Sequence, residues 1–147
     1  MGPKPSDCIF CAKPTEQRDR ENYILFRGRH GFIMLNAYPY SNGHLLVLPY
    51  DHRSTLEDLD EATAAELMLL TRRGIAALRR SMAPEGLNVG LNIGKAAGAG
   101  IADHVHMHIV PRWTGDTNFM PVLGGPRLVP ELLETTYDRL LAAGIAD

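Results

Sequence analysis

Apolar residues alternate with polar ones, or form short runs, in several stretches of this chain. Residues 23–26 and 32–35 are apolar runs joined by a turn with two glycines, which predicts a β-hairpin. Residues 44–48 follow a turn-rich stretch and precede Pro49, so they are expected to form a third strand. The alternation over residues 87–93 predicts a fourth strand.

Two further stretches have helical periodicity. Apolar residues recur at this spacing from about Asp60, a residue type that caps helix N-termini, until Pro84 interrupts the pattern. A last helix is expected from about Pro130 to Ala143, with Gly144 just past its end.

No linker long enough to separate domains is present, so residues 1–147 are expected to form one domain, with a flexible stretch over residues 1–7.

Three histidines stand at every second position, and three apolar residues separate or follow them: the chain reads His104-Val-His-Met-His-Ile109. On a strand, residues two apart share a face and lie about 7 Å apart, so the imidazoles are expected in one row above a buried apolar row. Because histidine titrates near neutral pH and can act as a nucleophile, such a row suits metal ligation or chemistry on an anionic centre. The alternative is a solvated polar face, which has no need of one residue type three times.

Composition and charge limit the classes of partner. The 147 residues are 45% hydrophobic and carry a formal net charge of −2, which is typical of a soluble domain with one core. This balance provides no general attraction to nucleic acid or to a membrane, so any phosphate must be bound by a local site. With two cysteines and no apolar signal segment, the chain is expected in the cytoplasm.

A glycine-rich segment, Asn92-Ile-Gly-Lys-Ala-Ala-Gly-Ala-Gly-Ile101, links the predicted fourth strand to the histidines. Small residues let backbone N–H groups approach an anion closely, and Lys95 adds a positive charge. A tight turn without any ligand explains the same composition. Its position directly before the histidines favours a role in the site.

The two cysteines, Cys8 and Cys11, form a Cys-x-x-Cys pair. In a reducing compartment such a pair is usually half of a metal site or a redox pair, and the antiparallel pattern offers no thioredoxin-like context for the latter. A structural zinc ion needs two more ligands, and the chain has six histidines from which to draw them.

The histidine run resembles the signature of the histidine triad superfamily of nucleotidyl hydrolases and transferases. The resemblance extends from Cys8 to about Tyr137: it includes the Cys-Ile-Phe-Cys stretch, Asn36 eight residues before His44, the stretch ending at His52, and Pro111-Arg-Trp-Thr-Gly-Asp-Thr-Asn-Phe119. These features are similar to a bacterial branch related to diadenosine tetraphosphate phosphorylases and fragile histidine triad hydrolases. The resemblance implies an α+β fold, with an antiparallel sheet of about five strands, two main helices, and a sheet that continues across a homodimer.

The resemblance also implies a mechanism. The α-phosphate of a purine nucleotide or dinucleoside polyphosphate would lie over the histidines, and His106 would attack it to form a nucleotidyl-histidine intermediate. His108 and His44 would contact phosphate oxygens or orient the ring of His106. For His44 the alternative is a bond to a backbone carbonyl.

The resemblance assigns a substrate-binding set as well. Asn36 would hold the ribose hydroxyls, although it also suits a simple turn. Asn92 and the backbone of Ala99 and Gly100 would receive the phosphate and its leaving group. Trp113 is assigned to the substrate site, with core or dimer packing as the alternative. The fragile histidine triad group has Gln before the triad, where this chain has residues 100–103, so the leaving-group proton donor is not identified.

In zinc-containing relatives, the histidine that matches His52 and the first triad histidine complete the metal site. The resemblance therefore implies a structural zinc ion on Cys8, Cys11, His52 and His104, against the alternative of an empty reduced cysteine pair; it implies no organic cofactor. Binding of one catalytic metal by all three triad histidines is disfavoured, because a straight row spreads its ends over roughly 14 Å.

Three functions remain open at this point. The first is cleavage of dinucleoside polyphosphates such as diadenosine tetraphosphate, with phosphate or water as acceptor. The second is hydrolysis of nucleoside phosphoramidates, and the third is a zinc-bearing nucleotide-binding module with little turnover. The triad favours catalysis, because binding alone does not need a nucleophile in the middle position. A homodimer or a higher assembly is expected, with no nucleic-acid or membrane partner.

Overall fold

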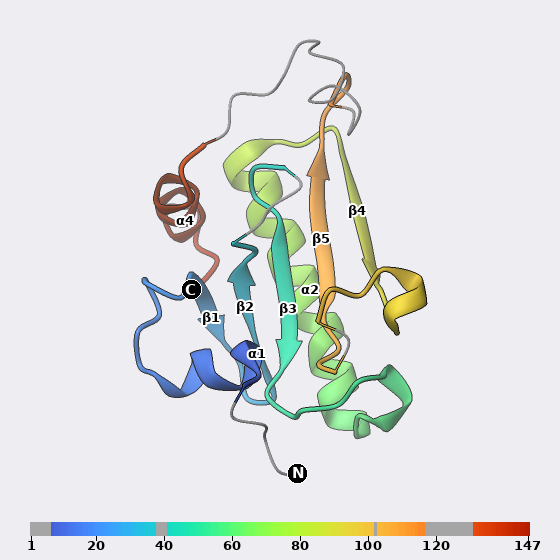
Figure 1. Ribbon diagram of the computed structural model, residues 1–147. Helices are drawn as coiled ribbons and strands as arrows, with labels where there is room; N and C mark the ends of the chain where they lie inside the picture. Colours follow the sequence, from blue (N-terminus) through green and yellow to red (C-terminus); the bar gives the residue numbers. More distant parts are fainter. Residues whose placement is uncertain (1–6, 38–40, 102, 117–130) are drawn as a thin grey trace.

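The computed structural model describes residues 7–37, 41–101, 103–116 and 131–147 (Figure 1). Its elements follow one another in this order: α1 (Ile9–Ala12), β1 (Ile24–Arg27), β2 (Gly31–Leu35), β3 (Leu45–Pro49), α2 (Glu61–Met82), β4 (Gly86–Leu91), β5 (Met107–Arg112) and α4 (Leu133–Ala142). Short 3₁₀ turns, η1 (Lys13–Thr15), η2 (Leu56–Asp58) and η3 (Lys95–Ala97), lie between them.

The five strands form one antiparallel sheet in the order β1-β2-β3-β5-β4. This confirms the predicted α+β class with an antiparallel sheet of five strands. On β5, His108 lies opposite Leu46 of β3 and Gly90 of β4. The histidine strand therefore has a hydrogen-bonded neighbour on each side.

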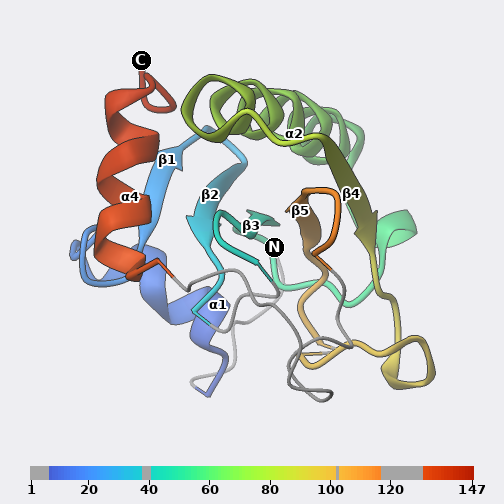
Figure 2. The ribbon, with the colours of Figure 1, turned by 90° about the horizontal axis from the view of Figure 1, so that it is seen from above.

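The helices lie on different sides of the sheet (Figure 2). Helix α2 covers one face and packs on β2, β3 and β5, whereas α1 lies on the other side and α4 lies beside β1. Side chains alternate along β3 and β5, so Val47, Met107 and Ile109 join the core under α2. Leu46 and Leu48 join a second cluster with α1. The same alternation directs His108 away from α2, to the side of the sheet where α1 lies.

The long helix begins where the sequence predicts. The side chain of Asp60 accepts a hydrogen bond from the backbone N–H of Thr63 at 2.8 Å, which confirms the expected N-cap. The last helix is also confirmed, and the Tyr137 hydroxyl joins it to β1 by donating to the Ile24 carbonyl at 2.7 Å. Its expected start at Pro130 lies outside the described residues, as does most of the expected flexible stretch over 1–7.

The expectation that all three triad histidines lie on one strand is wrong. Strand β5 begins at Met107, so His104 and His106 precede it. The physical reason is a change of backbone partner: the N–H of Val105 donates at 2.7 Å to the carbonyl of Arg53, which lies beyond the end of β3. The apolar row is as predicted, because Val105, Met107 and Ile109 are all buried.

Candidate metal centre and active site

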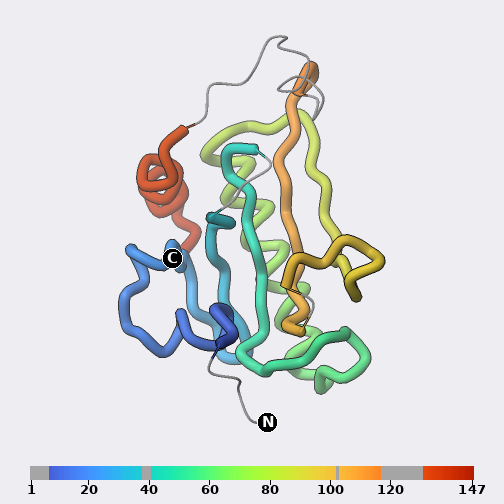
Figure 3. Tube along the Cα trace, in the orientation of Figure 1, coloured from blue at the N-terminus to red at the C-terminus, as the bar shows by residue number. Residues whose placement is uncertain are grey.

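Three segments far apart in the sequence meet at one end of the sheet (Figure 3). Helix α1 brings Cys8 and Cys11, the chain after β3 brings His52, and the segment before β5 brings His104. One potential ligand atom from each of these residues lies within 4.8 Å of the other three. The four residues named from the sequence can therefore bind one metal ion together.

The distances between the ligand atoms match a tetrahedral site. Of the six distances between the four ligand atoms, the one between the Nδ1 atoms of His52 and His104 is 3.3 Å, and three of the sulfur–nitrogen distances are 3.5 Å for Cys8–His104, 3.3 Å for Cys11–His52 and 3.6 Å for Cys11–His104. The other two are at most 4.8 Å. Zinc bonds of about 2.0–2.1 Å to nitrogen and 2.3 Å to sulfur place ligand atoms about 3.3–3.7 Å apart in a tetrahedron. The donor set and its spacing thus fit a closed Cys₂His₂ site.

The His104 ring is oriented by the end of β3. Its Nε2 lies 2.9 Å from the carbonyl oxygen of Pro49, which accepts a hydrogen bond from it. This bond places the ring hydrogen on Nε2 and leaves the lone pair of Nδ1 for a metal ion. Histidines that ligate metals commonly donate their other ring N–H in this way.

The middle histidine, His106, uses its ring nitrogens in the opposite sense. Its Nδ1 donates to the backbone carbonyl of His104 at 2.8 Å, so the lone pair lies on Nε2. The ring is buried, and its centroid lies 4.9 Å from the His108 ring. An imidazole held with a free Nε2 is suited to nucleophilic attack.

A second pair of histidines lies beside it. His44 Nε2 and His108 Nδ1 are 2.9 Å apart, so one of the two nitrogens donates to the other. The amide of Asn36 is 3.4 Å from the Nδ1 of His44. His108 lies on strand β5, and His44 is the residue just before β3.

Burial keeps these rings neutral near pH 7. Desolvation, with smaller contributions from His108 and His106, lowers the pKa of His44 to about 4. Burial also lowers the pKa of His106 and, together with His106, that of His108. Neutral rings leave a lone pair available on His106 for attack.

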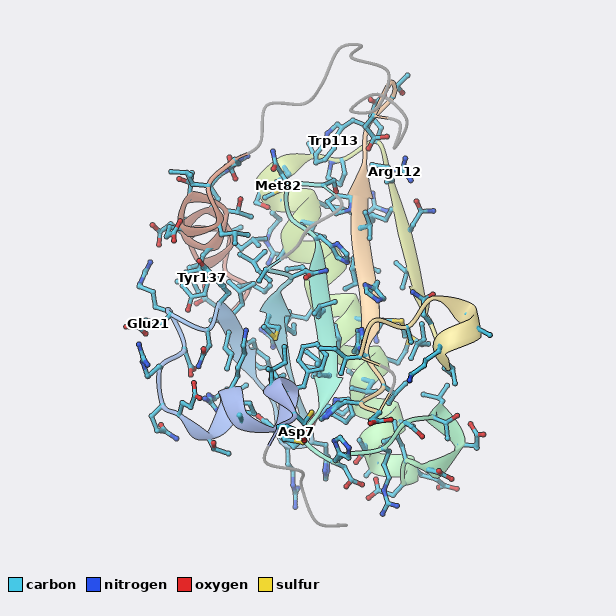
Figure 4. All side chains as sticks on the ribbon, in the orientation of Figure 1. Asp7, Glu21, Met82, Arg112, Trp113 and Tyr137 are labelled. Carbon is cyan, nitrogen blue, oxygen red and sulfur yellow. The ribbon has the colours of Figure 1, made fainter. Side chains whose placement is uncertain are left out.

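The residues assigned to substrate binding differ in where they lie. Asn36 directly follows β2 and approaches His44, whereas Asn92 follows β4. Ala99 and Gly100 lie in the glycine-rich segment, where the Ala99 N–H donates to the Gly94 carbonyl at 3.3 Å. Trp113 follows the end of β5, and Figure 4 shows it at the opposite end of the sheet from Asp7, the neighbour of Cys8. Their contacts with substrate stay a prediction.

Known protein families and structures were compared with this chain. The model of the HIT domain family matches residues 17–115. This chain belongs to the HIT domain family. A HIT relative named "AP-4-A phosphorylase" from Mycobacterium tuberculosis is 47% identical over 84% of this chain and 63% of that protein, so the chain spans less than two thirds of its length.

Two further HIT relatives bear on the site. An adenosine 5'-monophosphoramidase of Schizosaccharomyces pombe is 33% identical over 71% of this chain and 74% of that protein. The crystal structure of a Zn-bound histidine triad family protein from Mycobacterium smegmatis superposes with a TM-score of 0.75. It is 30% identical and covers 93% of this chain and 92% of that chain.

The HIT site also contains a residue that the sequence reasoning missed. Phe10, between the two cysteines, is buried and packs against the rings of His104 and His106. Its place in the Cys-Ile-Phe-Cys stretch was visible, but no local pattern links residue 10 to residue 106.

In the described part of this HIT chain, no helix is both long and apolar enough to span a membrane.

Proposed function

We propose that this HIT protein is a nucleotidyl transferase or hydrolase that cleaves dinucleoside polyphosphates, with diadenosine tetraphosphate as the representative substrate. The observation that carries the proposal is the 2.8 Å bond from His106 Nδ1 to the His104 carbonyl, which leaves Nε2 free beside His108. The name of the M. tuberculosis relative supports the choice of substrate.

The reaction proceeds in two displacements. The Nε2 of His106 attacks the α-phosphorus, a P–N bond forms as the P–O bond to the remaining phosphates breaks, and the shortened nucleotide leaves. Phosphate or water then attacks the same phosphorus, the P–N bond breaks, and neutral His106 is restored. His108 holds a phosphate oxygen, and His44, which is fully buried 2.9 Å from His108, orients that ring. The second displacement determines which products form.

The substrate-binding assignments belong to this proposal. Asn36 holds the ribose hydroxyls, while Asn92, Ala99 and Gly100 receive the phosphate and its leaving group. Trp113 contacts the nucleotide from the far end of β5. Support comes from the resemblance of these positions to the family and, for Asn36, from its approach to His44.

The products of diadenosine tetraphosphate identify the reaction, and the measurement is chromatography after incubation with and without inorganic phosphate. ADP with ATP in the presence of phosphate indicates phosphorolysis, and AMP with ATP indicates hydrolysis through the same intermediate. Two molecules of ADP from hydrolysis would contradict attack at the α-phosphorus, because that product requires cleavage at the centre of the tetraphosphate. If micromolar enzyme produces no turnover, the result would instead support a zinc-bearing nucleotide-binding module with little activity.

The S. pombe relative favours a second candidate, hydrolysis of a nucleoside phosphoramidate. The first displacement at His106 is then the same, with an amine in place of a phosphate as leaving group. Comparison of kcat/KM for adenosine 5'-phosphoramidate and diadenosine tetraphosphate separates the two. We expect diadenosine tetraphosphate to be cleaved at least as efficiently as the phosphoramidate. A clear preference for the phosphoramidate would identify the protein as a nucleoside phosphoramidate hydrolase.

Zinc is the metal we propose for the Cys₂His₂ site, in a structural role. The tetrahedral spacing of the four ligand atoms supports it, as does the Zn-bound relative from M. smegmatis. Cys8, Cys11, His52 and His104 would fill all four positions of the ion, and the bound ion would hold α1 against the segment before β5. Elemental analysis of protein purified without chelator should find about one zinc per chain.

The remaining expectations are a single domain, a homodimer and a cytoplasmic location. The dimer is supported by β4, an edge strand of the sheet with Val89 44% exposed and Ile93, just beyond it, 42% exposed. The location is supported by two cysteines that form no disulfide and can bind a metal. Light scattering of the purified protein tests the assembly, with a mass of two chains as the expected value.

A further inference from the structure

Helix α1 is held in place by its neighbours, because it has only four residues. An isolated helix of this length is not stable in water, so its position depends on packing and on side chains that fix its ends. Cys8 stands at its N-cap and Cys11 lies within it, and both belong to the metal-binding set. Whatever α1 presents to the active site is therefore positioned by the metal-binding residues together with the apolar cluster that α1 joins.

Helix α1 presents the ring of Phe10 to the histidines. This side chain is only 5% exposed. Its centroid lies 5.1 Å from that of His106, with the rings tilted by 58°, and 5.7 Å from that of His104 in an edge-to-face arrangement. One aromatic ring thus touches both a metal-binding histidine and the proposed nucleophile.

The His106 ring needs such a support. Within the described residues it makes one hydrogen bond, from Nδ1 to the His104 carbonyl, and that bond fixes one atom of the ring. Rotation about the side-chain bonds between the backbone and the ring would still displace Nε2, which lies on the other side of the ring from this hydrogen bond. Phe10 on one side and His108 on another restrict this rotation by direct packing.

We propose that Phe10 is a positioning residue that holds the His106 ring for attack. The inference rests on the proposed function of His106. Phe10 acts through His106 and takes no part in the bond changes.

Two variants of Phe10 test the proposal, with Phe26→Leu as the matched control. Phe26 lies on β1 and packs under Arg73, in a different part of the sheet. We expect Phe10→Leu to lower kcat about tenfold and Phe10→Ala about a hundredfold, while KM stays within about threefold, because misplacement by about 1 Å costs on the order of a hundredfold. Zinc content of Phe10→Leu should stay at about one per chain.

A readout on the ring itself separates positioning from a general structural effect. In ¹⁵N NMR spectra of histidine-labelled protein, the two ring-nitrogen signals of His106 report its Nδ1 hydrogen bond and are little affected by the ring current that Phe10 exerts. These signals should shift in Phe10→Leu, where the ring is no longer held against the His104 carbonyl, and stay unchanged in Phe26→Leu. Unchanged His106 signals, or a loss of kcat no larger than that in the control, would overturn the proposal. A rise in KM with kcat intact would also overturn it, since Phe10 would then bind nucleotide.

The two proposals fail in different ways. If wild-type protein cleaves none of the nucleotides tested, the proposed function fails, yet the His106 signals still report whether Phe10 orients the ring. If wild-type protein is active and Phe10→Leu matches the control in rate and spectrum, only the positioning role fails.

Discussion

At the scale of single residues, His104 and His106 differ in which ring nitrogen the backbone occupies. His104 donates from Nε2 to the Pro49 carbonyl and so directs Nδ1 to the cysteines, whereas His106 donates from Nδ1 and so frees Nε2. Two identical side chains, two positions apart, thereby present different ring nitrogens, one suited to a metal ion and the other to nucleophilic attack. The backbone, rather than the residue type, decides between them.

Replacement of His106 by Ala should remove turnover by at least about a thousandfold while nucleotide affinity changes by less than about tenfold, since a nucleophile acts mainly in the transition state. Rapid-quench kinetics and binding of a non-reacting analogue measure the two quantities. Replacement by Gly leaves room for free imidazole, which should restore part of the rate. An Ala variant that keeps a tenth of the wild-type rate would refute the covalent route.

The buried His44 should make stability depend on pH. Its pKa is lowered from about 6.5 to about 4, chiefly by burial beside His108 and His106, so between these values the unfolded state binds more protons than the folded state. The contribution is complete above about pH 6.5 and is lost as pH falls toward 4. Urea unfolding at pH 7.5, 6 and 5 should show a steeper loss in wild-type protein than in His44→Gln. Equal slopes for both proteins would exclude this origin.

At the scale of elements, the sequence predicts the regular parts of the fold and misses the parts that contacts between distant segments determine. Apolar runs, alternation and turn residues located the strands, and Asp60 located the start of α2, because these signals are local. The start of β5 was placed too early, since nothing in the histidine run shows that Val105 bonds to Arg53. Helix α1 was missed because its four residues, Ile9–Ala12, are too few to show a helical period. The resemblance supplied the metal set, which spacing alone left open.

Loss of the metal should release α1 and lower thermal stability. We expect Cys8→Ser to lose zinc and to melt at least about 5 °C below wild-type protein, since about 1 kcal/mol shifts the melting temperature by a few degrees in a chain of this size. Chelator should lower the melting temperature of the wild type to that of the variant and leave the variant unchanged. His106→Ala should retain zinc. A metal-free preparation with full stability and activity would rule the site out.

At the scale of the whole molecule, the two faces of the sheet differ in what covers them. Helix α2 buries the face that carries Val47 and Ile109, so the opposite side is left for chemistry. His108 lies near the start of β5, whereas Trp113 follows its end, five residues or about 17 Å beyond His108. Arg112 and the N–H of Trp113 both bond to Asp116, at 3.0 Å each, and so order the turn that carries the indole.

This separation yields a prediction that distinguishes the two substrate classes. A dinucleoside tetraphosphate places its second nucleoside three phosphates away from the attacked phosphorus, whereas a phosphoramidate has nothing at that distance. If Trp113 stacks on the second base, Trp113→Ala should lower kcat/KM for diadenosine tetraphosphate at least about tenfold, the order of one base–aromatic stack, and leave that for adenosine 5'-phosphoramidate within about twofold. Trp113→Phe, which keeps an aromatic face, should recover most of the loss. Equal losses for both substrates, accompanied by a lower melting temperature, would instead assign Trp113 to core or dimer packing.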